Sequence, residues 1–306
     1  MTPRVTVLTA TYNQAAFVRT CVESVLSQTM PDWEMVAVDD GSTDGTPDAV
    51  RAFRDPRIRV LGLEHAGIER LHDRYNRALE EAACPLVAVL EGDDAWPREK
   101  LEIQVARMER DDAVVSFGAC DIRDRAGRIL SRQRPLLERA NGRRMAELLL
   151  THSSAMPFSP TVIVRAAALR SLGGFRQTPY LPLVDFPTWL ELTRLGDFRG
   201  HPEVLGFYRF YADSVSNRRR RDVIDGLRRY SLEFLARHPD LRALRRRVDG
   251  LHAYATALHD LENGRGARAF RGLAAAARLA SPAMRVRAVG RILQGIVERG
   301  RILSRV

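Results

Sequence analysis

Three acidic side chains gather at the end of one short apolar segment. Residues 87–90 form an apolar run the length of a buried strand, and Glu91, Asp93 and Asp94 follow within four positions. A strand covered by helices on both faces cannot hold charges, so these carboxylates must emerge at its carboxyl end. Clustered carboxylates repel one another, and Mg²⁺ or Mn²⁺ relieves that repulsion while bridging to substrate phosphates. The alternative is a solvated acidic turn before a helix that starts at Pro97.

A second acidic segment follows an earlier predicted strand. Residues 34–38 are mainly apolar and run directly into Asp39, Asp40 and a Gly- and Thr-rich stretch that ends at Thr46. Ligands of open α/β sheets bind outside the carboxyl ends of the strands. One acidic edge could be accidental, but two at the same edge of one sheet indicate a site.

Strands and helices that alternate along the first hundred residues must position these two segments. Strand patterns occur at residues 5–12, 34–38, 58–63 and 87–90, with helical patterns between them. Asn13 is expected to cap the first helix. Alternation with short links predicts a parallel sheet with right-handed crossovers.

The predicted site favours a nucleotide-diphosphate ligand. The first strand-to-helix turn has no Gly-x-Gly-x-x-Gly, and the chain has no Walker loop, which disfavours dehydrogenases and P-loop proteins. A receiver domain would carry its acidic pair after the first strand and would be far shorter. One Asp can accept a hydrogen bond from a base N–H or a ribose hydroxyl, while a metal neutralises the pyrophosphate at the other acidic cluster.

Three ordered motifs resemble the N-terminal signature of glycosyltransferase family 2. They are Thr9 to Asn13, Val38 to Thr46, and Leu90 to Asp94. The resemblance extends to about Ser216. It implies an α/β fold of the GT-A type, with a Rossmann-like, mostly parallel central sheet flanked by helices. It also implies a metal-dependent enzyme that moves a sugar, with inversion, from a nucleotide-diphospho-sugar to an acceptor hydroxyl.

The resemblance assigns a role to each matching residue. Asp40, together with Asp39, is expected to hold the base or ribose of a UDP-, dTDP- or GDP-linked donor. Asp93 and Asp94 match the D-x-D position that binds Mn²⁺ or Mg²⁺ and the diphosphate, whereas Glu91 replaces the family's usual first Asp, so its role stays open. The expected nucleotide-sugar residues are Thr9, Thr11, Tyr12, Asp39, Asp40, Arg70 (with Arg74 as the alternative) and Asp93.

Asp185 matches the position of the family's general base. Leu183 to Leu192 resembles a segment in which Glu-Asp precedes an aromatic-rich helix, and Val184 replaces the Glu. Inverting transfer needs one carboxylate to take the proton of the acceptor hydroxyl. Asp185 also suits a helix N-cap, and both roles can hold together.

Further segments resemble the family's acceptor half. Gly173 to Phe175 resembles the element before the acceptor site, although a Gly pair after a helix is also an ordinary C-cap. Residues 152–160 are expected to form an acceptor-side loop. In the segment that closes the catalytic domain, Tyr211 stands where a His is common. Arg218 to Arg221 could reach the diphosphate, but a solvated basic linker is the preferred interpretation.

Composition restricts the class and the compartment. The 306 residues, 45% of them hydrophobic, suffice for one large domain or two. The three cysteines are scattered, which suits a reducing cytoplasm. No apolar run approaches the length of a bilayer span, and the sequence begins with a strand pattern rather than a signal peptide. We therefore expect a cytoplasmic protein. The net charge of +10 attracts phosphates, anionic lipid or nucleic acid without choosing among them.

Two domains are expected. Residues 1–216 form the GT-A domain, with a nucleotide-binding half at 1–96 and an acceptor half at 97–216. Residues 217–306 form an all-α extension that is basic and amphipathic. Its last helix, around residues 286–303, has the pattern of a helix that lies on the inner face of the cell membrane, although packing against protein is commoner.

The leading hypothesis is a glycosyltransferase of surface-glycan or glycosylated-metabolite biosynthesis, with a glycan, lipid-linked or small-molecule acceptor. A sugar nucleotidyltransferase would need a Gly-rich basic loop after the first strand, and residues 9–13 lack one. A catalytically silent nucleotide-sugar-binding scaffold stays open because of the departures at Glu91, Val184 and Tyr211. Nucleic-acid binding is not expected, since no recognised motif accompanies the positive charge.

Overall fold

The computed structural model describes residues 2–211 and 214–279, and the chain divides into two compact units. The sheet unit consists of Met1–Ala146 and Ser154–Asn217, and the helical unit consists of Glu147–Ser153 and Arg218–Val306. The amphipathic helix expected around residues 286–303 lies outside the described residues. No described helix is both long enough and apolar enough to cross a bilayer.

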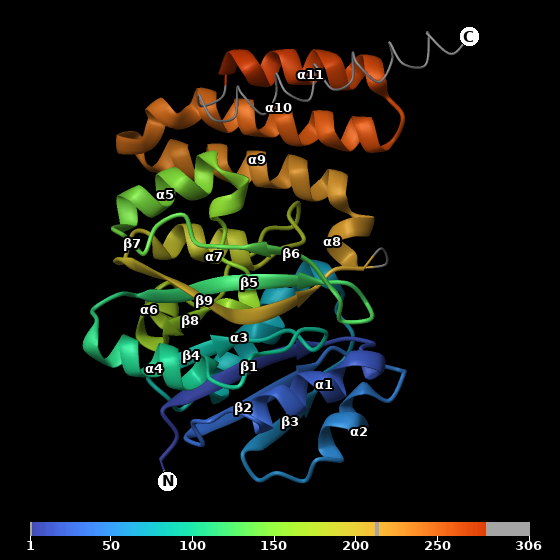
Figure 1. The fold of residues 1–306 in the computed structure, drawn as a ribbon, viewed down its shortest axis with the longest axis vertical. Coiled ribbons are helices and arrows are strands. Elements are labelled where there is room, and N and C mark those ends of the chain that lie inside the picture. The colour runs from blue at the N-terminus through green and yellow to red at the C-terminus, as the bar shows by residue number, and fades with distance from the viewer. Residues whose placement is uncertain (1, 212–213, 280–306) are drawn as a thin grey trace. The chain divides into compact units, whose positions relative to one another are not determined.

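The sheet unit is built on one mixed nine-stranded sheet (Figure 1). Its first four strands are parallel neighbours in the order β3 (Ile58–Gly62), β2 (Trp33–Asp39), β1 (Val5–Thr11) and β4 (Leu86–Val89). The sheet continues through β8 (Ile163–Arg165), β5 (Val115–Arg123), β9 (Phe198–Arg209) and β7 (Arg139–Ala140), and β6 (Ile129–Gln133) pairs with β5 beside this path. β8 runs antiparallel to β4 and β5, and β9 runs parallel to β5. The predicted α/β fold with a mostly parallel central sheet is confirmed.

Helices cover the parallel part of the sheet on both faces. Residues of α1 (Ala15–Leu26), α2 (Thr46–Arg51) and α4 (Lys100–Arg110) share one apolar core with β1, β2 and β4. α3 (Leu71–Glu81) packs against β1 and β2 from the opposite side (Figure 1). Later in the chain come α5 (Gly142–Thr151), whose residues from Glu147 onward belong to the helical unit, and α6 (Ala166–Ser171) and α7 (Asp185–Leu192) of the sheet unit. Short 3₁₀ turns occupy Ile68–Arg70, Ser153–Ala155 and Ser159–Thr161. The acidic residues that follow β2 and β4 therefore lie at the carboxyl ends of these strands, outside the apolar core.

A buried polar network supports the loop that follows β4. Lys100, the only lysine of the chain, is fully buried, and its Nζ donates to Oε1 of Gln104 at 2.7 Å. The same Nζ lies 4.4 Å from the ring centroid of Trp96, and burial lowers the pKa of Lys100 well below its usual range. Gln104 Nε2 in turn donates to Ser116 Oγ at 2.9 Å and to the carbonyl oxygen of Thr161 at 3.0 Å. α4, β5 and the turn before β8 are thereby tied together beneath the loop.

The helical unit contains α9 (Arg220–Arg237), α10 (Arg245–Glu262) and α11 (Gly266–Leu279), with a 3₁₀ segment at Pro239–Leu244. α8 (Val215–Arg218) precedes them. A Cβ atom at Gly272 would lie 2.9 Å from that of Ala257, so the glycine permits the close approach of α10 and α11. Arg220 and Arg221, expected in a solvated basic linker, instead begin α9 and pair with Glu262 and Asp225 inside this unit. The predicted all-α C-terminal part is present.

Candidate active site at two acidic strand ends

The β2 cluster consists of Asp39 and Asp40, where β2 ends. The Asp39 carboxylate accepts hydrogen bonds from Thr11 Oγ1 at 2.9 Å, from the Ser42 N–H at 2.8 Å and from Ser42 Oγ at 2.6 Å. Only 3% of Asp39 is exposed. Thr11 and Asp39 therefore hold the turn after β2 against the end of β1.

The turns after β1 and β2 fix each other. Asn13 adopts a φ of +49°, and its Oδ1 accepts the Thr43 N–H at 2.9 Å. Asp44 Oδ2 accepts the N–H of Ala15, the first residue of α1, at 2.9 Å. The expectation that Asn13 caps α1 is wrong, because this capping oxygen comes from Asp44 on the neighbouring turn. The two sequence motifs thus form one interlocked structure.

Asp40 is paired with Arg74, which reaches it from α3. The Arg74 guanidinium donates to Asp40 Oδ1 and also to the carbonyl oxygen of Glu64 at 2.6 Å. The backbone N–H groups of Ala66 and Gly67 donate to the same carboxylate at 3.1 and 3.3 Å. The charge of Asp40 is therefore compensated inside the protein, and 7% of the residue stays exposed.

An aromatic pair stands beside the β2 cluster. The ring of Tyr12, 44% exposed, stacks on His65 with centroids 4.2 Å apart and planes 17° apart, and His65 Nδ1 lies 2.9 Å from Asp40 Oδ2. Thr9 is fully buried in β1, and its hydroxyl finds no hydrogen-bond partner among the described residues. Arg70 has a 65% exposed side chain that pairs with Asp73 at 2.7 Å. Of the expected nucleotide residues, Tyr12 and Asp40 lie together, whereas Thr9 is internal and Arg70 is peripheral.

The β4 cluster consists of Glu91, Asp93 and Asp94, and protein donors bind each of them. Tyr75 Oη donates to Glu91 Oε1 at 2.9 Å, and Tyr211 Oη donates to Asp93 Oδ2 at 2.7 Å. The backbone N–H of Arg209, on the last residue of β9, donates to Asp94 Oδ1 at 2.8 Å. The loop therefore joins two distant parts of the chain, α3 and the segment at the end of β9.

The β4 cluster is electrostatically crowded. Burial, followed by repulsion from Asp93, raises the pKa of Glu91 to about 7. Burial and the charges of Asp93 and Glu91 raise the pKa of Asp94 well above its usual range, and burial also raises the pKa of Asp93. Glu91 Oε2 and Asp94 Oδ2 are buried without a hydrogen-bond partner in the described part of the chain. Such orphaned oxygens favour an additional positive charge.

The donor set fits a hard divalent cation that is completed by substrate. Within residues 2–211 and 214–279, no three His, Cys, Asp or Glu side chains form a metal cage by themselves. Mg²⁺ usually takes one or two carboxylates and fills its other positions with water and substrate phosphates. The orphaned oxygens of Glu91 and Asp94, beside Asp93, match that pattern.

Asp185 is the first residue of α7, and its carboxylate lies near the β4 cluster. Val184, not Asp185, is the N-cap, and Asp185 Oδ1 accepts the Phe186 N–H at 2.7 Å. Burial raises the pKa of Asp185 to about 6, and its negative charge adds to the raised pKa of Glu91. A carboxylate at this helix end gains from the helix dipole. The fold therefore brings Asp185 within electrostatic range of a loop some ninety positions earlier in the sequence.

An aromatic stack connects α7 with the β4 cluster. The Tyr75 and Phe175 rings lie 4.9 Å apart, and Trp189 of α7 meets Phe175 edge-on at 6.4 Å. Asn76 Oδ1 accepts the Phe175 N–H at 2.6 Å, and Gly174 beside it has a φ of +99°. Sequence reasoning missed Tyr75, Asn76 and Arg209; the Gly-Gly-Phe motif was the one local signal that marked this contact.

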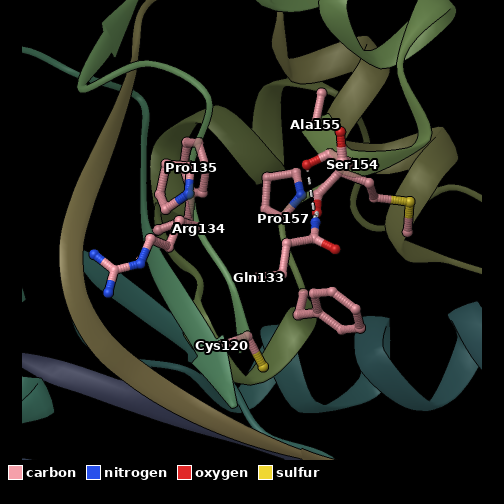
Figure 2. A pocket seen from close by; sticks show the side chains of 11 residues that line it. Cys120, Gln133, Arg134, Pro135, Ser154, Ala155 and Pro157 are labelled. Atoms are coloured by element: carbon pink, nitrogen blue, oxygen red, sulfur yellow. Dashed lines mark hydrogen bonds between the residues drawn. The ribbon is translucent and has the colours of Figure 1, made fainter. Parts of the chain in front are cut away.

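A hollow of about 210 Å³, including its open mouth, lies in the acceptor half between β5, β6 and residues 154–158 (Figure 2). Gln133 Nε2 donates to the carbonyl oxygens of Ser154 at 2.9 Å and Met156 at 3.2 Å, so β6 holds this loop in place. Its lining is mostly apolar and includes Phe117, Cys120, Pro157 and Phe158. Phe158 also packs on Tyr208 of β9, with ring centroids 5.0 Å apart.

Known proteins resemble this chain in sequence and in fold. The family model "Glycosyl transferase family 2" matches residues 6–173. TuaG of Bacillus subtilis, named as a glycosyltransferase of teichuronic acid biosynthesis, is 33% identical over 222 residues, which are 70% of this chain and 82% of that protein.

Solved structures agree on the fold. Staphylococcus aureus TarS 1-349 matches with a TM-score of 0.62 at 19% identity, covering 92% of this chain and 82% of that one. The mannosyltransferase PcManGT from Pyrobaculum calidifontis, in complex with GDP-Man and Mn²⁺, matches with a TM-score of 0.58 at 22% identity, covering 96% and 81%. Fold and site thus define a glycosyltransferase with the GT-A fold. The chain belongs to glycosyl transferase family 2, as the motifs predict.

Proposed function

We propose that this glycosyltransferase moves a sugar, with inversion, from a nucleotide-diphospho-sugar to an acceptor hydroxyl, and that it requires Mn²⁺ or Mg²⁺. The observation that carries the proposal is the β4 cluster, in which two buried carboxylate oxygens lack partners beside the carboxylate of Asp185. The relationship to TuaG supports a place in surface-glycan biosynthesis, with glycosylated metabolites as the other product class.

The nucleotide is proposed to bind over the β2 cluster. The exposed Tyr12 ring offers a flat face to a base, and Asp40 can accept a hydrogen bond from the base or ribose. The two interlocked turns that would bind the nucleotide are supported by Thr9, Thr11 and Asp39, which thus contribute indirectly. Arg70 is exposed and can contact the diphosphate. TarS has been solved with UDP-GlcNAc and PcManGT with GDP-Man, so uridine and guanosine donors both suit related folds.

The diphosphate end of the donor is proposed to lie at Asp93 and Asp94. A divalent cation bound there would neutralise the charge that develops on the departing diphosphate. Tyr211 and Arg209 orient the two carboxylates through the hydrogen bonds already described. Glu91, held by Tyr75, adds negative charge that strengthens cation binding.

Asp185 is proposed to be the general base. Its carboxylate takes the acceptor hydroxyl's proton as that oxygen attacks the anomeric carbon, while the bond between that carbon and the diphosphate oxygen breaks. Attack from the side opposite the leaving group inverts the anomeric centre. A pKa of about 6 keeps Asp185 ionised at neutral pH yet close enough to neutrality to accept a proton efficiently.

Residues 1–216 are proposed to be sufficient for this chemistry, divided into a nucleotide-binding half (1–96) and an acceptor half (97–216). The acceptor would be a glycan, a lipid-linked sugar or a small molecule, bound along the acceptor half. Within the basic residues 217–306, the amphipathic sequence around residues 286–303 would provide peripheral contact with the inner face of the cell membrane.

Ligand-induced thermal stabilisation of the purified full chain tests the proposal. UDP, dTDP and GDP are compared with and without Mn²⁺ or Mg²⁺, because a ligand that binds only the folded state raises the unfolding midpoint. We expect one nucleotide to stabilise the protein chiefly when metal is present. In Asp94→Asn, that metal-dependent increment should disappear while the smaller metal-free response remains. Equal stabilisation with and without metal in the wild type, or no response to any nucleotide, would refute the proposed site.

A further inference from the structure

Exposed apolar side chains concentrate on one edge of the sheet unit. Of the nine large hydrophobic residues exposed among the described positions, four are Ile129, Leu130, Leu136 and Leu137. Ile129 and Leu130 are each 56% exposed, and Leu136 and Leu137 are 45% and 38% exposed. We define the β6 edge as residues 123–139, which include the turn before β6, β6 itself and the segment after it.

The β6 edge is an ordered structure with both faces uncovered. β6 pairs with β5 alone in the described sheet, and every residue from Ile129 to Arg132 is exposed. The register with β5 shifts at this point, where Ile122 faces Ser131 but Arg123 faces Ile129, so Leu130 is the extra residue of a bulge and both apolar side chains stand uncovered at an irregular strand edge. Asp124 Oδ1 accepts the N–H groups of Ala126 and Arg128, each at 2.9 Å, which fixes the turn.

The β6 edge is also basic. Residues 123–139 include six arginines and only two acidic residues. Four of these arginines are paired with carboxylates: Arg128 with Asp124, Arg123 and Arg132 with Asp121, and Arg139 with Asp112 and Asp197. Arg125 and Arg134 are exposed and have no carboxylate partner in the described part of the chain, and Arg134 extends away from residues 154–157 (Figure 2). Positive charge and apolar groups therefore occupy the same surface.

The β6 edge is anchored to the β4 cluster. Arg209 donates through Nη1 to the carbonyl oxygen of Arg125 at 2.9 Å and through Nε to the carbonyl oxygen of Asp93 at 2.8 Å. The Arg123 guanidinium lies 3.5 Å from the ring centroid of Phe207. A surface that binds this edge would consequently be held beside the acidic loop.

We propose that the β6 edge is a docking surface for an anionic lipid bilayer. A fluid interface can surround exposed apolar groups on an irregular strand edge, whereas a rigid protein groove must match their positions. The arginines complement the phosphates of anionic headgroups. A second copy would bring two basic edges together, and the chain's own residues 280–306 carry six arginines and one glutamate, so both occupants are disfavoured by like charge. An acceptor hydroxyl at the membrane surface would then lie close to the β4 cluster.

Vesicle co-flotation of the full chain tests the docking surface without donor or metal, so its outcome is independent of the proposed catalytic chemistry. Vesicles of phosphatidylcholine with phosphatidylglycerol are compared with vesicles of phosphatidylcholine alone. We expect binding to the anionic vesicles that weakens with added salt. The double substitution Ile129→Ser with Leu130→Ser should lower the partition coefficient about tenfold or more, since burial of both apolar side chains is lost. The matched control, Leu261→Ser with Phe270→Ser on exposed positions of α10 and α11, should change it less than about twofold.

A site-resolved measurement separates the β6 edge from other lipid contacts. Trp33, Trp96 and Trp189 are at most 3% exposed, so a tryptophan introduced by Leu130→Trp reports its own surroundings above a constant background. Its emission should shift to shorter wavelength on phosphatidylglycerol vesicles, and that of Phe270→Trp should not. Binding without a shift at position 130, or absence of vesicle binding, would overturn the proposal. A lipid-free shift that accompanies a doubled mass in light scattering would also overturn it, because the occupant would then be a second copy.

Discussion

The two acidic strand ends flank the same central strand, yet the protein compensates the negative charges at the end of β2 and leaves those at the end of β4 largely uncompensated. In the β2 cluster, Asp39 is saturated by hydroxyl and N–H donors, and Asp40 is paired with the Arg74 guanidinium. In the β4 cluster, three carboxylates share a buried volume without a comparable cation, and two of their oxygens lack partners among the described residues. The first cluster is complete as folded, whereas we propose that a bound cation completes the second.

This difference indicates that stability and function are separated between the clusters. Removing a charge that is already paired leaves its partner buried and uncompensated, which is strongly destabilising. Removing one of several mutually repelling carboxylates relieves strain in the free protein and damages only ligand binding. Substitutions of similar chemistry should therefore have opposite effects on the free energy of unfolding at the two sites.

The largest expected effect follows from Asp94→Asn. We expect kcat/KM for sugar transfer to fall by about three orders of magnitude, because charge stabilisation of the leaving diphosphate is lost. Without metal, the free energy of unfolding should rise by about 1 kcal/mol as repulsion with Asp93 and Glu91 is relieved. Transfer kinetics and urea unfolding measure the two quantities. A variant less stable than the wild type in the absence of metal would contradict the description of the β4 cluster as strained.

Asp40→Asn should act on stability instead. The substitution leaves the Arg74 guanidinium buried without its counter-charge, and we expect the free energy of unfolding to fall by about 3 kcal/mol. Asp48→Asn, which removes an exposed partner of Arg51, is the control and should cost less than about 0.5 kcal/mol. If both variants unfold at the same urea concentration, the ion pair between Asp40 and Arg74 does not make the expected contribution to the free energy of unfolding.

The pH dependence of transfer tests the role of Asp185 when the wild type is compared with a variant that lacks this carboxylate. Its pKa is raised to about 6, and a general base is active only when deprotonated, so the rate should fall as pH drops through this value. Below it, kcat/KM should decrease about tenfold per pH unit at saturating metal. Asp185→Asn should bind the donor normally, transfer sugar very slowly and lack this acid limb. An unchanged limb in the variant would assign the titration to another group.

The smallest effect is expected for Tyr211→Phe. The hydroxyl holds Asp93 Oδ2, so its loss should raise the metal concentration needed for half-maximal activity about tenfold while leaving urea unfolding unchanged. Tyr208→Phe, in which the ring still packs on Phe158, is the control for changes at the end of β9. Equal metal requirements in both variants would show that Tyr211 does not orient Asp93.

Local sequence patterns predicted the elements of the nucleotide-binding half well. Apolar runs marked β1, β2 and β4, and the acidic residues after two of them indicated a site because a buried strand cannot retain charge. The pattern could not tell that β1 lies between β2 and β4, since the order of strands depends on the crossovers. It also misplaced the cap of α1, because the oxygen supplied by Asp44 lies across the sheet rather than along the chain.

The acceptor half was less predictable for a physical reason. Its decisive contacts join residues far apart in sequence, such as Arg209 to Asp94 and Phe175 to Asn76. None of these pairs produces a periodic signal, because each depends on how β9 and α3 pack. The exposed strand β6 likewise lacks the alternation of a half-buried strand. Asp185 was found through resemblance to known sequences rather than through any pattern of its own.

The burial of Lys100 has a consequence for following the protein's motions in solution. The chain contains no other lysine side chain, and this amine is inaccessible while α4, Gln104 and Trp96 stay in place. An amine-directed reagent can modify it only during excursions that open the region beneath the acidic loop. The rate of lysine modification would therefore report the free energy of that opening, with and without donor bound, from a single natural position in the chain.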